Sequence, residues 1–190
     1  MSSELRLFPA VSLIGVACTA LLLAACGETD APVPTHSPQR IEAPVPAAAL
    51  PDCAAIAEAL GPLTEGLAVV DPAGTRQTAP ESHGLSCAWR SADDGAALGV
   101  IIIVDSQPLT EQDMRRAGLY VADPRVAALG GFIAFPDGQL DGAAILGPVG
   151  PQVIVGPVTV TLAGNARGAV ADVTLDQAID GAVAVHRRMR

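Results

Sequence analysis

The sequence predicts one α+β domain, in which a mostly antiparallel sheet is flanked by an N-terminal, a middle and a C-terminal helix. Three amphipathic helical patterns are separated by short apolar runs, which are divided by glycine and proline turns. Strands so closely spaced leave no room for helical crossovers, so neighbouring strands should run antiparallel. We expect a single globular domain over 52–190, a common domain size. Ala-Leu-Gly recurs at 59–61 and 128–130, so a duplicated helix-plus-meander is an alternative arrangement of these elements.

The first half of the domain is expected to form a helix and two strands. Asp52 is a good N-cap residue, and apolar residues follow it at helical spacing until Gly61-Pro62 ends the run. Apolar and polar residues alternate over 85–90, which predicts a half-buried strand. The run Leu-Gly-Val-Ile-Ile-Ile-Val at 98–104 predicts a fully apolar strand.

The second half is expected to form short strands between two helices. Thr110 opens the middle helix, which should end near Gly118 or run on to Ala122. Thr174 and Gln177 form a capping box, and the residues after them predict a terminal helix with one buried face. Between these helices, strands are expected at 131–135, 143–146, 153–155 and 158–162.

The N-terminal residues, 1–25, have the pattern of a cleavable export signal. A short charged start precedes an almost wholly apolar run over 7–23, which Leu23-Ala24-Ala25-Cys26 closes. This tetrapeptide resembles the lipobox of bacterial lipoproteins, where the cysteine receives a diacylglycerol and becomes the first residue after cleavage. Diacylglycerol and palmitate on Cys26 would place the domain on the extracytoplasmic face of the cell membrane. The alternatives are an ordinary secretory leader and an uncleaved helix, although Pro9 and Gly15 make the run a marginal span.

Residues 26–51 are expected to comprise the lipidated cysteine and a disordered, proline-rich tether. Six prolines and no sizeable apolar cluster mean that this segment cannot bury a core. Polyproline II geometry gives about 3.1 Å per residue, so the tether could extend roughly 75 Å. That length would lift the domain clear of the lipid headgroups.

Two cysteines, Cys53 and Cys87, remain once Cys18 is assigned to the leader and Cys26 to the lipid. In an oxidising compartment two cysteines most simply form a disulfide. A metal pair or a redox site would need a third ligand or a Cys-x-x-Cys motif, and the sequence has neither. The bridge would attach the first helix to the sheet.

The segment Cys-Ala-Ala-Ile-Ala-Glu-Ala-Leu-Gly at 53–61, followed by Ser-Cys-Ala-Trp at 86–89, resembles a family of actinobacterial cell-envelope lipoproteins. The family combines a lipobox, a polar tether, a Cys-led helix, a Cys-x-Trp strand and a terminal helix, and its domain has no known function. The resemblance covers roughly 52–105, and the remainder follows the family only in element order. It implies a surface lipoprotein with a Cys53–Cys87 bridge, and it supplies no catalytic residues.

Composition excludes several classes of partner. The net charge is −9, and aromatic residues make up only 3% of the chain. An acidic surface repels phosphates, and so few aromatic rings offer no platform on which bases could stack, so nucleic acid is not expected as a partner.

Gly84-Leu85-Ser86-Cys87-Ala88 faintly resembles a nucleophile elbow, but it lacks the second glycine and lies within an expected strand.

The leading functional hypothesis is a non-catalytic binding or accessory module of the cell envelope, which contacts a protein or a small apolar ligand. One alternative is a carrier of lipid. Another is an envelope hydrolase whose site is assembled from dispersed residues such as Asp71, Glu81, His83 and Asp105. No cofactor and no metal ion are expected, because the sequence contains no clustered ligand motif.

Overall fold

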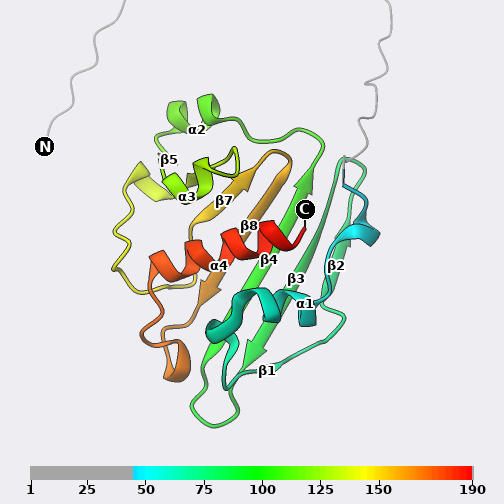
Figure 1. Cartoon of the computed structure of the whole chain (residues 1–190), viewed down its shortest axis with the longest axis vertical. Helices are drawn as coiled ribbons and strands as arrows, with labels where there is room; N and C mark the ends of the chain where they lie inside the picture. Colours follow the sequence, from blue (N-terminus) through cyan, green and yellow to red (C-terminus); the bar gives the residue numbers. More distant parts are fainter. Residues whose placement is uncertain (1–44, 190) are drawn as a thin grey trace, which may run out of the picture. The chain divides into compact units, whose positions relative to one another are not determined.

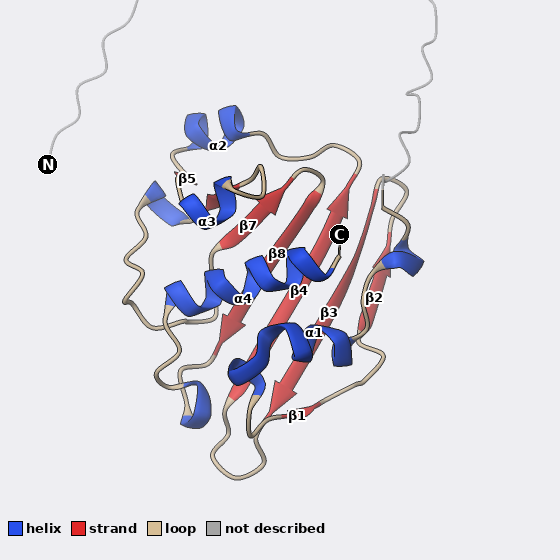
Figure 2. Ribbon diagram, viewed as in Figure 1, coloured by secondary structure: helices blue, strands red, loops and turns tan. Residues whose placement is uncertain are grey.

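The computed structural model describes residues 45–189, which form an eight-stranded antiparallel sheet with helices along one side (Figures 1 and 2). The strands lie in the order β1–β3–β4–β8–β7–β6–β5, and β2 pairs with β3 along the same edge as β1. The α+β class with a C-terminal helix is therefore confirmed. The expected leader, Cys26 and most of the expected tether lie outside the described residues.

Two long central hairpins and several short elements make up this domain. The strands are β1 (Ala68–Val69), β2 (Thr75–Thr78), β3 (Ser82–Arg90), β4 (Ala97–Asp105), β5 (Tyr120–Val121), β6 (Phe132–Ala134), β7 (Gln152–Val155) and β8 (Val158–Gly164). The helices are α1 (Cys53–Leu60), α2 (Glu111–Ala117), α3 (Pro124–Ala127) and α4 (Leu175–Arg188). The strands β2–β3–β4 and β8–β7–β6 each form a meander in this sheet, and the duplicated helix-plus-meander considered from the sequence stays a prediction.

The helix ends expected from capping residues are confirmed. The Asp52 side chain accepts a hydrogen bond from the Ala55 amide at 2.8 Å, so it caps α1. Thr174 and Gln177 form both hydrogen bonds of the capping box that opens α4. Helix α2 ends at Gly118, which adopts the left-handed conformation (φ 70°). The extension of this helix to Ala122 is therefore wrong.

Two expectations about loop segments need correction. The strand expected over 143–146 is wrong, because Ile145 forms only an isolated bridge with Thr174. The amide of Leu175 donates to the Ala144 carbonyl at 2.8 Å, so this segment is held by the start of α4 rather than by the sheet. The expected tether reaches residue 51, but the Leu50 side chain is buried, so the packed part of the chain begins before residue 52.

The core lies between the sheet and the helical layer. Side chains on alternate positions of β3, β4 and β8 are buried against α1 and α4. Gly181 allows α4 to approach closely, because a Cβ there would lie 3.0 Å from side-chain atoms of Leu60, Leu63 and Leu162. Helix α4 buries one face, as its sequence predicts, through Leu175, Ala178, Ile179, Ala182, Val183, Val185 and His186.

The Cys53–Cys87 disulfide is present and joins the first residue of α1 to the centre of β3, with a Cα–Cα distance of 5.6 Å. Both cysteines are buried. The bond therefore fixes the start of the N-terminal helix onto the sheet.

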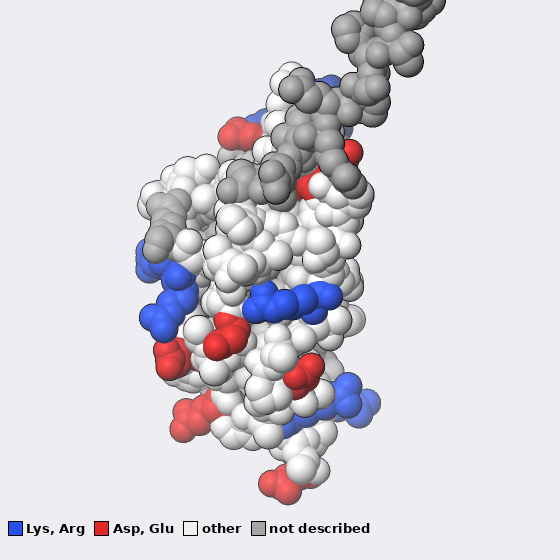
Figure 3. Space-filling model, turned by 90° about the vertical axis from the view of Figure 1, so that its right-hand side faces the viewer, with Lys and Arg blue, Asp and Glu red and all other residues white. Residues whose placement is uncertain are grey.

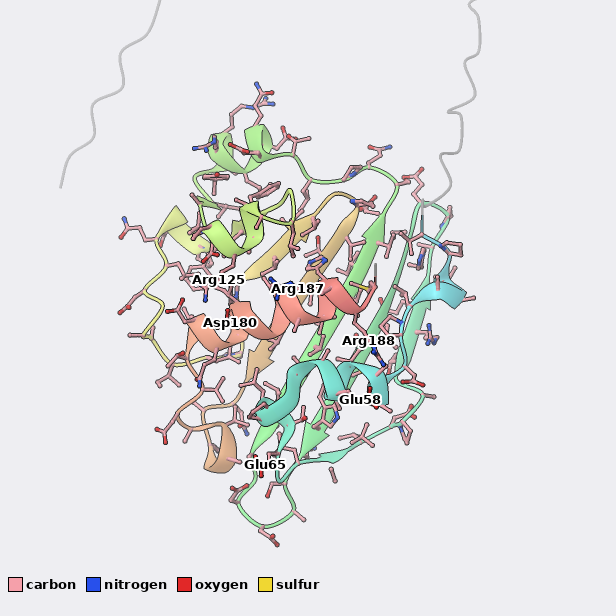
Figure 4. The ribbon with its side chains drawn as sticks, in the orientation of Figure 1. Glu58, Glu65, Arg125, Asp180, Arg187 and Arg188 are labelled. Carbon is pink, nitrogen blue, oxygen red and sulfur yellow. A yellow bond between two sulfur atoms is a disulfide. The ribbon has the colours of Figure 1, made fainter. Side chains whose placement is uncertain are left out.

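Ion pairs join the helices on the outer side of this layer (Figure 4). Arg125 after the start of α3 contacts Asp123 at 2.6 Å, Asp176 at 2.9 Å and Asp180 at 3.1 Å. The hydrogen bond from Arg125 lowers the pKa of the Asp123 carboxyl, which also caps α3. Arg188 of α4 pairs with Glu58 of α1 at 3.0 Å. These contacts give the helical side of the molecule a charged surface.

Candidate functional site: the helix-free face of the sheet

One face of the sheet is covered by helices α1, α3 and α4, and no helix among residues 45–189 lies over the opposite face of β3, β4 and β8 (Figures 1 and 2). We call the outward positions of these three strands the helix-free face. Strand alternation and register place the following residues on it: Ser82, Gly84, Ser86, Ala88, Arg90, Ala97, Gly99, Ile101, Ile103, Asp105, Thr159, Thr161 and Ala163.

Two large apolar side chains are exposed at the middle of this face. Ile101 is 45% exposed and Ile103 is 44% exposed, whereas the intervening Ile102 is fully buried. The strand expected at 98–104 is therefore confirmed, but its apolar residues are divided between the core and solvent. Covering the exposed part of each isoleucine would contribute on the order of 1 kcal/mol. Because these two exposed apolar side chains lie on one strand of the same face, this face is a candidate contact site.

The surface around these isoleucines is uneven. Ile101 lies between Ser86 and Thr161 on the adjacent strands, and Ile103 lies beside Gly84. A hollow of about 280 Å³ lies toward one end, where its lining includes Ala88, Gly99 and Ala163. A second hollow of about 230 Å³ lies toward the other end, and Gly84 and Ile103 border it. The face therefore carries an apolar ridge with a hollow toward each end.

Charge on the helix-free face is confined to its two ends. Arg90 lies at the last position of β3, and Asp105 lies at the last position of β4, which is the opposite end of the hairpin. The side of the molecule seen in Figure 3 differs, because basic and acidic side chains are interspersed there among uncharged residues. The uncharged middle of the helix-free face suits an apolar contact with a polar rim.

The dispersed residues considered for a hydrolase are only partly brought together. Glu81, His83 and Asp105 lie at the same end of the β3–β4 hairpin, and Asp71 lies between β1 and β2. His83 pairs with Val104 and faces the helical side, so Asp105, one residue further along β4, points to the opposite face. The side chains of His83 and Asp105 therefore point to opposite faces of the sheet.

Two buried polar atoms near this end, His83 Nε2 and Ser106 Oγ, have no hydrogen-bond partner within the described part of the chain. Ser86 lies in the middle of β3 and not at a turn, so the expected strand is confirmed and the segment lacks the geometry of a nucleophile elbow. No cluster of three potential metal ligands occurs over 45–189.

Several surface hollows in the described region are small. Five of them have volumes between about 130 and 280 Å³. Sites for small molecules typically measure roughly 300–1,000 Å³. These five hollows therefore lie below the usual size of a small-molecule site.

No family model matches the chain, and no curated protein and no solved structure matches it either. Within residues 45–189, no helix combines the length and the apolar character needed to cross a bilayer. Function is therefore inferred from the helix-free face and from the N-terminal sequence.

Proposed function

We propose that the protein is a lipid-anchored binding module on the extracytoplasmic face of the cell membrane, and that it contacts a protein partner through the helix-free face. The observation that carries this proposal is the exposure of Ile101 and Ile103 on a face whose middle bears no charge. Chemistry on a bound substrate is not part of the proposal, because His83 and Asp105 lie on opposite faces of the sheet.

The proposed location is supported by the N-terminal sequence. An apolar run over 7–23 ends in Leu-Ala-Ala-Cys, and a proline-rich segment follows it. A disulfide at 53–87 suits an oxidising compartment outside the cytoplasm. A diacylglycerol supplies the two acyl chains that stable attachment requires. The resemblance of 53–61 and 86–89 to envelope lipoproteins points in the same direction.

The substitution Cys26→Ala is expected to abolish acylation and to leave the leader attached, because no thiol is present to receive the diacylglycerol. Intact-mass spectrometry of the chain isolated from cell membranes would show both changes. Cys18→Ala is the matched control, since this cysteine lies within the expected leader, and its mature mass should equal that of the parent. Normal cleavage and release of the Cys26→Ala chain would contradict the proposed anchor.

The proposed contact surface can be tested by photo-cross-linking in cells. A benzophenone amino acid in place of Ile103 is expected to form a covalent adduct with a protein, and Ile101→Arg should abolish this adduct because it introduces a charge into the apolar ridge. The same probe at Glu58, an exposed residue on the helical side, is the control and should give no such adduct. Equal adducts at both positions, or an Ile103 adduct that survives Ile101→Arg, would contradict binding through the helix-free face.

A further inference from the structure

We infer that the partner on the helix-free face is a second copy of this chain, packed face to face with its strands antiparallel to those of the first. The inference rests on the proposed function for its surface, and it adds the identity of the partner. Three features of the face point to self-association: the symmetry of the hairpin, the complementarity of its ridge and hollow, and the placement of its charges.

The β3–β4 hairpin has a natural centre for a two-fold axis. Strands β3 and β4 each contain nine residues, and their middle residues, Ser86 and Ile101, pair with each other. A two-fold interface brings the same patch of both copies together. We place the two-fold axis between the two sheets, above the Ser86–Ile101 pair and perpendicular to the strands. Each strand then lies over the same strand of the second copy and runs in the opposite direction. Position 103 of one copy then faces position 99 of the second.

This arrangement places the ridge of one copy over the hollow of the other. Ile103 and the residues paired with it on the adjacent strands face Gly99 of the second copy, which lies between Ala88 and Ala163. These three residues are small, and they line the hollow of about 280 Å³. Ile103 of each copy therefore lies over this hollow of the other, and Ile101 lies over Ile101 at the axis.

The same axis pairs opposite charges. Arg90 of one copy lies over Ser82 of the second, and Ser82 is the neighbour of Asp105 on the adjacent strand. Packed sheets lie about 10 Å apart and strands about 4.8 Å apart, so the extended arginine side chain can reach that carboxylate. Two such pairs form, one at each end. With an axis parallel to the strands, each set of residues paired across the sheet would instead lie over the same set in the second copy. Arg90 would then lie near Arg90, and the hollows would stay unfilled.

The area of the face limits the strength of the dimer. Three strand widths and nine residues of strand length correspond to roughly 430 Å² per copy, or about 860 Å² in total. Specific interfaces generally exceed about 1,000 Å², so this contact is weak on its own. The general repulsion between two chains of net charge −9 is screened beyond about 8 Å at physiological salt. Attachment of both copies to one membrane would further raise their local concentration.

Sedimentation equilibrium of the mature full-length chain in density-matched detergent tests this inference. The parent is expected to dimerise, and Ile103→Lys should weaken the dimer by about 100-fold, because both copies carry the change. Arg90→Glu and Asp105→Arg should each weaken it by about 10-fold through like-charge contacts, and their combination should restore affinity to within about 3-fold of the parent. Glu65→Arg, a charge reversal at an exposed position outside the helix-free face, should leave the dimer unchanged.

Each of the following results would overturn the inference that the partner is a second copy. A parent chain that is monomeric at about 100 µM excludes the dimer. A dimer that survives Ile103→Lys uses another surface, and a double charge exchange that restores nothing excludes the antiparallel orientation. A monomeric parent whose Ile103 probe captures a different polypeptide overturns self-pairing and leaves the proposed function standing. The absence of both the dimer and any Ile103 adduct overturns both. Thermal melts of all variants confirm that the fold is intact.

Discussion

Removal of the disulfide with Cys53→Ala/Cys87→Ala is expected to lower the free energy of unfolding by about 3–4 kcal/mol. The bond joins residues 34 positions apart, so its loss releases a large loop in the unfolded chain. It also ties α1 to β3, and without it the N-terminal helix is held only by its packing against α4 and the sheet. Urea unfolding followed by far-ultraviolet circular dichroism would measure the change.

A reductant control separates the bond from the packing of the sulfur atoms. The parent chain unfolded in the presence of a thiol reductant should approach the stability of the double alanine variant, because both lack the cross-link. A double variant whose stability lies within about 1 kcal/mol of the oxidised parent would contradict the assigned role of the bond.

Elements that carry their own local signals were predictable from the sequence. Asp52 and the Thr174–Gln177 box mark the starts of α1 and α4, because their side chains satisfy amides that the helix itself leaves free. Apolar residues over 98–104 and 158–162 mark β4 and β8 in the same way. These patterns depend on a few neighbouring residues, so they can be recognised from the sequence without knowledge of the tertiary structure.

Elements that exist only through their neighbours were not predictable. Strand β2 is exposed along its whole length, and its only pairing is with β3, so no alternation of apolar residues marks it. Strands β1 and β5 contain two residues each. The run over 143–146 shows the opposite error, because its apolar residues look like a strand while its backbone bonds to the chain before α4. Long-range pairing decides these segments, and single-sequence patterns do not record it.

The helix-free face was hidden by the composition of its central strand. A continuous apolar run fits burial on both faces, and only the placement of the helices shows that Ile101 and Ile103 point to solvent. The sequences of the adjacent strands β3 and β8 contain a pattern that could have indicated the exposed face. Polar or small residues at Gly84, Ser86, Thr159 and Thr161 alternate with apolar ones, and they indicate that one face of the sheet lacks a cover.

The substitution Gly150→Ala is expected to destabilise the fold by about 3 kcal/mol. A Cβ at this position would overlap the main-chain oxygen of Leu162, and it would also lie 3.1 Å from the Leu146 side chain. Leu162 belongs to β8, which is hydrogen-bonded in the middle of the sheet between β4 and β7, so its backbone cannot move away without disturbing both ladders. Urea unfolding of the purified chain would measure the loss.

Gly147→Ala provides a matched control in the same Gly-Pro-Val-Gly loop. A Cβ at Gly147 meets no atom within 4 Å, and its backbone is not in the left-handed region. Its effect should therefore lie within about 1 kcal/mol of the parent, with a small gain if alanine restricts the unfolded chain. Equal losses at both glycines would mean that general loop rigidity sets the stability. A loss of stability confined to Gly150→Ala would show that the close approach of this loop to β8 contributes to the stability of the fold.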